Sequence, residues 1–315
     1  MKFPRLYLCI LSSPSQISSF LKFAESRNYQ NGHSYFFILR FNFQEQSSNE
    51  VHQYNNAIKK IQSKYFIFVN EKYFAFFFKS IIRICSKFQT VNFVIGTTVG
   101  FYSWYIFEKI QVNKITIVDD GISILLIEKL VIKNGRKNIR FFSKYSKFIQ
   151  KELLDSKTLH AGDTPLNKSE TLEFLGVFGS PIVELEVIDI FQYEQIILKI
   201  ATIFGANNVL YFMHRKERKK FSDSSISEIT SETMNSIELI RSMKVLPRTY
   251  WTMHSSALID MMLVTSDPKF QFFFTSINSN LQMRNMKENG IDSSYLDDIF
   301  RLAGAKEISL DSLKN

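Results

Sequence analysis

Hydrophobic residues along the chain form short, almost wholly apolar runs that alternate with longer amphipathic stretches. Runs of four to eight residues rich in β-branched and aromatic side chains are typical of strands buried on both faces, and the intervening stretches have helical spacing. This alternation predicts a parallel sheet covered by helices. In the first half we expect strands at residues 5–11, 34–41, 65–69, 91–96 and 115–118, and helices at 51–62, 72–88, 102–110 and 122–132.

A basic, polar segment at residues 133–170 interrupts the alternation, and we interpret it as the junction between two domains. Within it, residues 139–154 have two interpretations. They form either an amphipathic helix that lies on a membrane or on an acceptor substrate, or a solvated basic face. The sequence thus predicts Rossmann-like domains at 1–155 and 156–315 with a cleft between them. In the second half we expect strands at 172–178, 209–213 and 270–275, helices at 193–203, 257–264 and 295–303, a helix end or strand at 236–243 and an apolar run at 250–253.

Composition and charge narrow the class of protein. The 315 residues include 31 Phe and carry a formal charge of +9, which fits a folded protein with an anionic partner: nucleic acid, an acidic membrane or a phosphorylated or carboxylated substrate. Cys9 and Cys85 lie in apolar runs, which predicts buried thiols, a reducing compartment and no metal cluster. The apolar stretch at 73–84 is shorter than the roughly 20 residues of a membrane span. We therefore expect a cytoplasmic protein, soluble or peripheral to the membrane.

Three polar motifs directly follow apolar runs, where the carboxyl ends of parallel strands should lie. They are Asp119-Asp120-Gly121, His214 and Ser255-Ser256. A carboxylate could deprotonate an acceptor hydroxyl, an imidazole could donate to a departing phosphate, and hydroxyls at a helix start could hold its oxygens. Each motif also has a purely structural interpretation: a capped turn, a hydrogen-bonded histidine at a strand end, and a helix N-cap.

In this order, the three motifs resemble those of the bacterial sialyltransferases, in the group of the lipooligosaccharide sialyltransferases and capsular polysialyltransferases. That group has a pair of acids followed by Gly, a His usually followed by Pro, and a Ser-Ser or Ser-Thr pair. Residues 178–184, with the sequence FGSPIVE, are similar to a further element of the lipooligosaccharide branch. The chain departs from the pattern at Arg215, which stands where Pro is usual.

The resemblance implies an α/β, GT-B-like fold and an inverting, metal-independent glycosyltransferase without a cofactor. The donor would be CMP-sialic acid (CMP-Neu5Ac) or a related CMP-sugar, and the acceptor an oligosaccharide or glycolipid of a bacterial surface glycan. The acceptor-side domain would come first and the donor-binding domain second. Asp120 would be the general base and His214 the phosphate-side group, with Asp119 and Glu184 as supporting or alternative bases. Asp189, near the Gly-Ser-Pro turn, is a further candidate for the base, and His254 competes with His214 for the acid role. Donor contacts would come from Gly121, Gly179, Ser180, Pro181, His214, Ser255 and Ser256.

Other functions remain open at the level of sequence. Within the same fold, the alternative is a capsular polysialyl or Kdo-type polymerase. From other classes, the alternatives are a basic nucleic-acid-binding protein and an inactive member of a capsule assembly complex. We expect no nucleic acid partner, because the basic residues form no recognised fingerprint. We expect a cytoplasmic location, with peripheral contact at the anionic inner face of the membrane as a further expectation.

Overall fold

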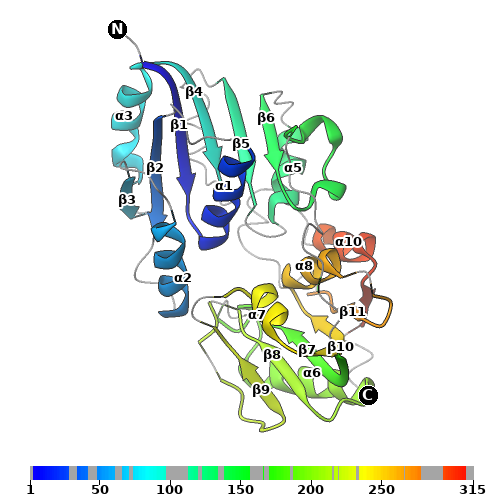
Figure 1. Cartoon of the computed structure of the whole chain (residues 1–315). Coiled ribbons are helices and arrows are strands. Elements are labelled where there is room, and N and C mark those ends of the chain that lie inside the picture. The colour runs from blue at the N-terminus through cyan, green and yellow to red at the C-terminus, as the bar shows by residue number, and fades with distance from the viewer. Residues whose placement is uncertain are drawn as a thin grey trace. The chain divides into compact units, whose positions relative to one another are not determined.

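The computed structural model divides the chain into two compact units, residues 1–46 with 51–161 and residues 47–50 with 162–315 (Figure 1). Each unit has a sheet of six parallel strands, and each is described by itself below. The residues that the structure describes are 3–27, 34–41, 48–60, 66–70, 74–96, 113–119, 123–133, 138–156, 166, 170–184, 187–214, 216–218, 220–231, 234–265, 267–277 and 294–309.

The sheet of the first unit has the strand order β3-β2-β1-β4-β5-β6. Strands β1 to β3 run in one direction across the sheet, and the chain then returns to the other side of β1 with β4. This is the strand order of a Rossmann fold. The strands are β1 (Phe3–Leu11), β2 (Ser34–Phe41), β3 (Phe66–Asn70), β4 (Phe88–Ile95), β5 (Lys114–Val118) and β6 (Ile139–Phe142); the helices are α1 (Pro14–Ser26), α2 (Ser48–Lys59), α3 (Phe74–Cys85) and α5 (Ser123–Lys133).

Strand β1 is buried on both faces, as its nearly continuous apolar sequence predicts. Tyr7, Cys9 and Leu11 pack into one core cluster with residues of α1 and α2, so these two helices share a face of the sheet. The alternate residues, such as Leu8, are equally buried, so the other face is covered as well. The Cys9 and Cys85 thiols are both free and buried, as predicted.

Part of the segment interpreted as a basic junction is instead the last strand of this sheet. Ile139, Phe141 and Phe142 in β6 are fully buried, and β6 pairs with β5 in parallel. Short 3-10 turns at Ser146–Phe148 and Lys151–Leu153 follow. The expectation of an amphipathic helix at 139–154 is therefore wrong. Although basic residues flank this short apolar run, pairing with β5 and burial of its side chains stabilise it as a strand.

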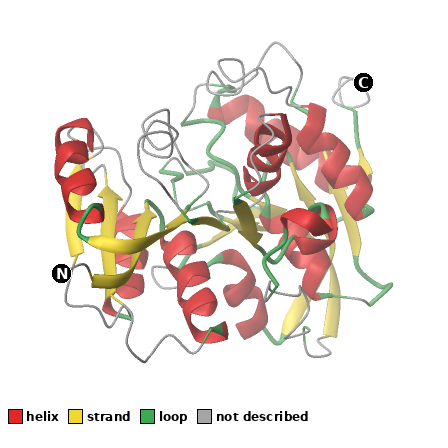
Figure 2. Ribbon diagram, turned by 90° about the horizontal axis from the view of Figure 1, so that it is seen from above, coloured by secondary structure: helices red, strands yellow, loops and turns green. Residues whose placement is uncertain are grey.

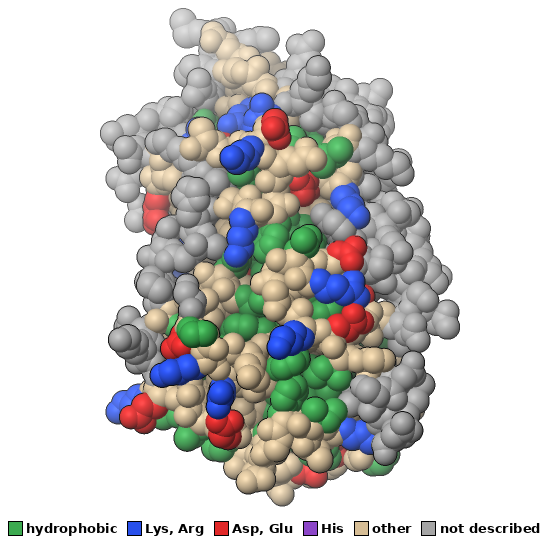
Figure 3. Space-filling model, turned by 90° about the vertical axis from the view of Figure 1, so that its right-hand side faces the viewer, with side chains coloured by type: hydrophobic (Ala, Val, Ile, Leu, Met, Phe, Trp, Pro, Cys, Tyr) green, Lys and Arg blue, Asp and Glu red, His purple; other side chains and the backbone are tan. Residues whose placement is uncertain are grey.

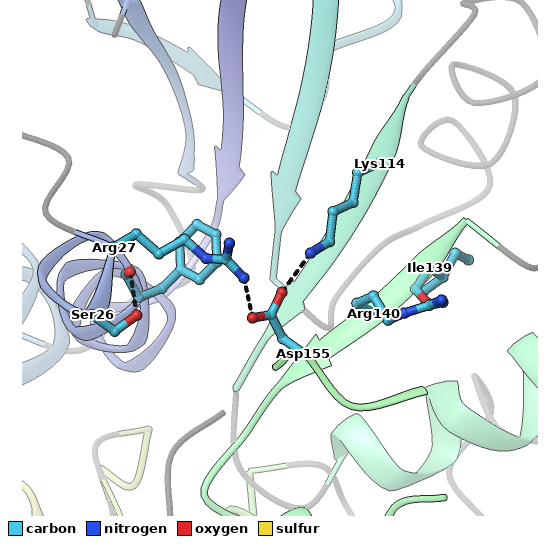
Figure 4. A network of polar contacts seen from close by, with 7 residues as sticks. Ser26, Arg27, Lys114, Ile139, Arg140 and Asp155 are labelled. Atoms are coloured by element: carbon cyan, nitrogen blue, oxygen red, sulfur yellow. Dashed lines mark hydrogen bonds and ion pairs between the residues drawn. The ribbon is translucent and has the colours of Figure 1, made fainter. Parts of the chain in front are cut away.

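A buried ion-pair network joins three segments of the first unit (Figure 4). The Asp155 carboxylate has no exposed surface, and it accepts hydrogen bonds from Arg27, just after α1, and from the Lys114 ammonium at 2.7 Å. The backbone N–H of Asp155 donates to the Phe141 carbonyl at 2.8 Å. Asp155 thus ties the segment after β6 to α1 and to the start of β5.

The sheet of the second unit has the order β12-β11-β10-β7-β8-β9, which repeats the topology of the first. Strands β7 to β9 extend one way, and β10 returns to the other side of β7. The strands are β7 (Glu170–Phe178), β8 (Val209–Phe212), β9 (Ile226–Ile229), β10 (Val245–Thr252), β11 (Gln271–Phe274) and β12 (Lys306–Glu307); the helices are α6 (Ile190–Ile203), α7 (Ser236–Ser242), α8 (Ala257–Val264) and α10 (Ser294–Ala303).

Aromatic side chains fill both faces of this second sheet. On one face, Tyr193 of α6 packs with Tyr211 and Trp251. The alternate strand residues Phe178 and Tyr250 stack with ring centroids 5.4 Å apart. Figure 2 shows the helices lying beside the strands when the molecule is seen from above.

The structure confirms the predicted fold class, α/β and GT-B-like with two Rossmann-like domains. The cleft between them stays a prediction. The sequence did not predict β6, β9 and β12, which are short edge strands. The helix expected at 102–110 lies outside the described residues.

The face of the molecule drawn in Figure 3 carries charges of both signs. On the face in Figure 3, the basic and acidic side chains of the described residues are interspersed, with hydrophobic side chains between them. Among the helices that the structure describes, none is both long and apolar enough to cross a bilayer.

Candidate functional site

Three neighbouring strands of the second sheet bring most of the predicted site residues to one edge. Strands β10, β7 and β8 are adjacent and parallel, so their carboxyl ends share an edge. The chain order reverses between β7 and β10, and ligands of open α/β sheets bind in the crevice at such a point. The Thr252 hydroxyl donates to the Phe178 carbonyl at 2.8 Å, which holds these two strand ends together.

The segment Gly179-Ser180-Pro181 continues directly from β7. Gly179 donates its N–H to the Phe212 carbonyl of β8 at 2.9 Å, so the ladder extends one residue beyond the strand. A Cβ on Gly179 would lie 2.8 Å from the Tyr211 hydroxyl and closer still to Glu217 Oε2. A side chain at position 179 would therefore displace the Glu217 carboxyl group or the Tyr211 hydroxyl, whereas the sequence suggested only a tight turn. The Ser180 hydroxyl is buried and has no hydrogen-bond partner among the described residues.

His214 follows β8 by two residues. Its Nδ1 accepts the backbone N–H of Lys216 at 3.2 Å. A neutral imidazole with an accepting Nδ1 carries its proton on Nε2, which is the tautomer that can donate to a phosphate oxygen. His214 is half-buried, and its own backbone N–H donates to Glu217 Oε2 at 2.5 Å.

Glu217 lies in the loop after β8, and no feature of the sequence singles it out as a site residue. Its carboxylate accepts hydrogen bonds from the Tyr211 hydroxyl and from the backbone N–H groups of His214 and Ser180. Burial raises its pKa to about 8, against the opposing effect of these hydrogen bonds. The only signal was a single acid within the basic run RKERKK, a pattern that normally indicates a solvated surface.

Ser255 and Ser256 lie after β10, at the start of α8. Ser256 is the N-cap residue, but its side chain makes no capping hydrogen bond. The Ser255 hydroxyl, which is buried, accepts the Ala257 N–H at a long 3.4 Å. The interpretation of the pair as an ordinary helix cap therefore does not explain the Ser256 side chain, which makes no capping hydrogen bond.

The preceding residue, His254, competes with His214 as the phosphate-side acid in the sequence. Burial lowers the pKa of His254 to about 4, so its imidazole is neutral at pH 7. A neutral imidazole can donate one hydrogen bond to a phosphate oxygen, but it is a poor proton donor.

Glu184 and Asp189 both belong to the segment between β7 and α6. Glu184 Oε1 accepts the Arg218 N–H at 2.8 Å and so bridges to the loop after β8. Asp189 is the N-cap of α6, and its side chain accepts the Gln192 N–H. Glu184 therefore connects to the loop after β8, and Asp189 has a structural role as a helix cap.

Asp119 lies in the first unit, at the carboxyl end of β5. It is buried, and its Oδ2 accepts the Lys144 N–H at 2.8 Å, which connects the ends of β5 and β6. Asp120 and Gly121, the predicted base and its neighbour, lie outside the described residues, as does Arg215. The structure thus groups Gly179, Ser180, Pro181, Glu184, His214, Ser255 and Ser256 in the second unit.

Comparison with known proteins yields structural similarity alone. The sequence matches no known family profile and no curated protein sequence. Similar structures include the UDP-GlcNAc 2-epimerase from Methanocaldococcus jannaschii (TM-score 0.47, 10% identity, covering 97% of this chain and 89% of that one). A putative UDP-N-acetylglucosamine 2-epimerase from Listeria monocytogenes has a TM-score of 0.45 and 8% identity, covering 88% and 79%. An alpha-glucosyltransferase (AGT) in complex with UDP has a TM-score of 0.35 and 11% identity, covering 95% and 91%.

At such TM-scores and identities, these similarities decide neither activity nor substrate. The class of the protein is defined by its own topology, which is that of two successive Rossmann-like domains. The resemblance to the sialyltransferases stays a prediction. Within the described residues, no group of three or more His, Cys, Asp or Glu side chains is arranged to hold a metal ion.

Proposed function

We propose that this chain is an inverting glycosyltransferase that transfers sialic acid or a related nonulosonic acid from a CMP-sugar to a bacterial lipooligosaccharide or capsule. The observation that carries the proposal is the meeting of Gly179-Ser180, His214 and Ser255-Ser256 at the switch point of the second sheet. This is where an α/β sheet binds the phosphate of a nucleotide.

The donor's phosphate would contact the hydroxyls of Ser180 and Ser256 and the Nε2–H of His214. Ser180 offers a buried hydroxyl with no partner among the described residues, and Ser256 one that makes no capping bond. The exposed residues Lys216, Arg218 and Lys220 follow His214 and would raise the local positive potential for an anionic donor.

In the transfer step, an acceptor oxygen attacks the anomeric carbon of the sugar while the bond from that carbon to the CMP phosphate oxygen breaks. Asp120 takes the proton of the acceptor hydroxyl, and His214 donates to the departing phosphate oxygen. Asp119 orients the loop that carries Asp120, and Glu184 is the alternative base. The proposal requires no metal ion and no organic cofactor.

The acceptor in this proposal is an oligosaccharide or glycolipid reached from the cytoplasmic side. The basic residues of both units would contact the anionic inner face of the membrane peripherally. Nucleic acid has no part in the proposed function.

The test is CMP release by the purified protein from CMP-Neu5Ac and CMP-Kdo, with galactose-terminated and sialylated acceptors. We expect acceptor-dependent release that falls by at least about 100-fold in Asp120→Ala and His214→Ala, the usual cost of a general base or a phosphate donor. His52→Ala is the matched control, because it removes an exposed imidazole of α2 in the first unit. Absence of CMP binding and of release from either donor would refute the proposal.

A further inference from the structure

Glu217 connects two loops of the candidate site through its carboxylate. Oε2 accepts the His214 N–H at 2.5 Å, and the Ser180 N–H also donates to the carboxylate. Ser180 belongs to the loop after β7 and His214 to the loop after β8. The Tyr211 hydroxyl, on β8 beneath these loops, donates to Oε1 and anchors the carboxylate to the sheet.

The connection between the loops runs in both directions. Glu184, in the loop after β7, accepts the Arg218 N–H of the loop after β8 at 2.8 Å. Each loop thus supplies a glutamate that binds a backbone N–H of the other. At Gly179, a Cβ would collide with the Glu217 carboxyl group and the Tyr211 hydroxyl, so these two side chains pack directly against the backbone of the loop after β7.

We propose that Glu217 is a positioning residue that fixes the loop after β7 (residues 179–184) to the loop after β8 (residues 213–218). In this arrangement the Ser180 hydroxyl and the His214 imidazole face the donor with a constant spacing. The assignment of a CMP-sugar as the ligand rests on the proposed function, whereas the coupling of the two loops does not.

The geometry distinguishes a glutamine from an alanine at this position. In Glu217→Gln, the amide oxygen can still accept the two backbone N–H groups, and the NH₂ can donate to the Tyr211 oxygen. The Tyr211 hydrogen can then turn to the Tyr193 hydroxyl, 3.4 Å away. In Glu217→Ala, both backbone N–H groups and the Tyr211 hydroxyl lose their partner at once.

Hydrogen–deuterium exchange measured by mass spectrometry tests the coupling without any substrate. In Glu217→Ala we expect exchange to quicken about tenfold in both loops, the effect of losing one hydrogen bond to this buried carboxyl group, with β10 still protected. Glu217→Gln should stay close to the wild type. Faster exchange in the loop after β8 alone, or equal loss of protection throughout the second unit, would overturn the proposal.

Glu194→Ala is the matched control. Glu194 is a buried glutamate that accepts the backbone N–H of Ser222 at 2.6 Å, farther along the connection from β8 to β9, and within the described residues it has no hydrogen bond to Ser180 or His214. It should quicken exchange near Ser222 and leave residues 179–184 protected. If the Glu217→Ala variant does not fold, Glu217→Asp takes its place in the exchange experiment. The shorter aspartate side chain should release one loop and so fail to hold both.

Kinetics with the CMP-sugar then test whether the coupling matters for donor binding. Glu217→Ala should raise the KM for the donor about 10- to 100-fold, and Glu217→Gln should restore most of the loss. If the wild type cleaves no CMP-sugar, the proposed function fails while the exchange data still decide the role of Glu217. An active wild type with unchanged KM and kcat in Glu217→Ala would overturn its role in positioning.

Discussion

The buried carboxyl of Glu217 should make the second unit less stable as the pH rises. Burial raises its pKa from 4.5 to about 8, and the groups that face it are Tyr211, Tyr193, His214 and Glu184. Between these two pH values the folded chain keeps a proton that the unfolded chain has lost. The free energy of unfolding therefore falls as the pH rises, by about 1.4 kcal/mol per pH unit.

The comparison with Glu217→Gln isolates this contribution, because glutamine does not titrate. From pH 5.5 to pH 7.5, the wild type should lose about 3 kcal/mol relative to the variant, and the loss should level off above about pH 8. Urea unfolding at several pH values measures it, followed by the fluorescence of Trp251 in a Trp104→Phe background. Trp251 is fully buried in the second unit and packs near Tyr193, so it reports on this unit.

Parallel pH dependences in the two proteins would refute this reasoning. They would mean that the hydrogen bonds from Tyr211, His214 and Ser180 stabilise the carboxylate enough to offset its burial. Other carboxyl groups whose pKa values burial raises, such as Glu128 and Asp297, are common to both proteins and cancel in the difference.

Two further substitutions test the packing. Gly179→Ala should destabilise the second unit by about 1–3 kcal/mol and weaken CMP binding, because the alanine Cβ would displace Glu217. Urea unfolding measures the change in stability, and calorimetry measures the change in CMP affinity. Unchanged values for both would contradict the close approach. Asp155→Ala should destabilise the first unit by about 2 kcal/mol, less than the loss of a fully buried pair, because Arg27 and Lys114 are partly exposed. Asp155→Asn should destabilise this unit less than Asp155→Ala does. Equal stability of Asp155→Ala and the wild type in urea unfolding would show that the network contributes nothing.

Elements with strong local patterns were predicted well from the sequence. The strand at 34–41 and the helix at 257–264 have the predicted bounds, and β1 and β5 differ by two residues or fewer. Strands buried on both faces need apolar residues at every position, and this demand is visible in any short window. Because parallel strands end at a common edge, the polar residues that follow them could also be selected as candidates.

The weaker elements and the partners of the site residues depended on the tertiary structure. β6 is a short apolar strand, Ile139–Phe142, flanked by basic residues, and its strand conformation is stabilised by pairing with β5. Likewise, Asp189 looked like a candidate base, but its place at the start of α6 makes it a helix cap.

The sequence by itself determined the alternation of strands and helices, the fold class and the segments after β7, β8 and β10, because local composition controls which residues can be buried. Only the tertiary structure decided which of these segments meet. Glu217 contacts Ser180, and Glu184 contacts Arg218, across more than thirty residues of chain. A buried carboxylate needs partners, and which backbone N–H groups supply them depends on strand order, which no local pattern contains.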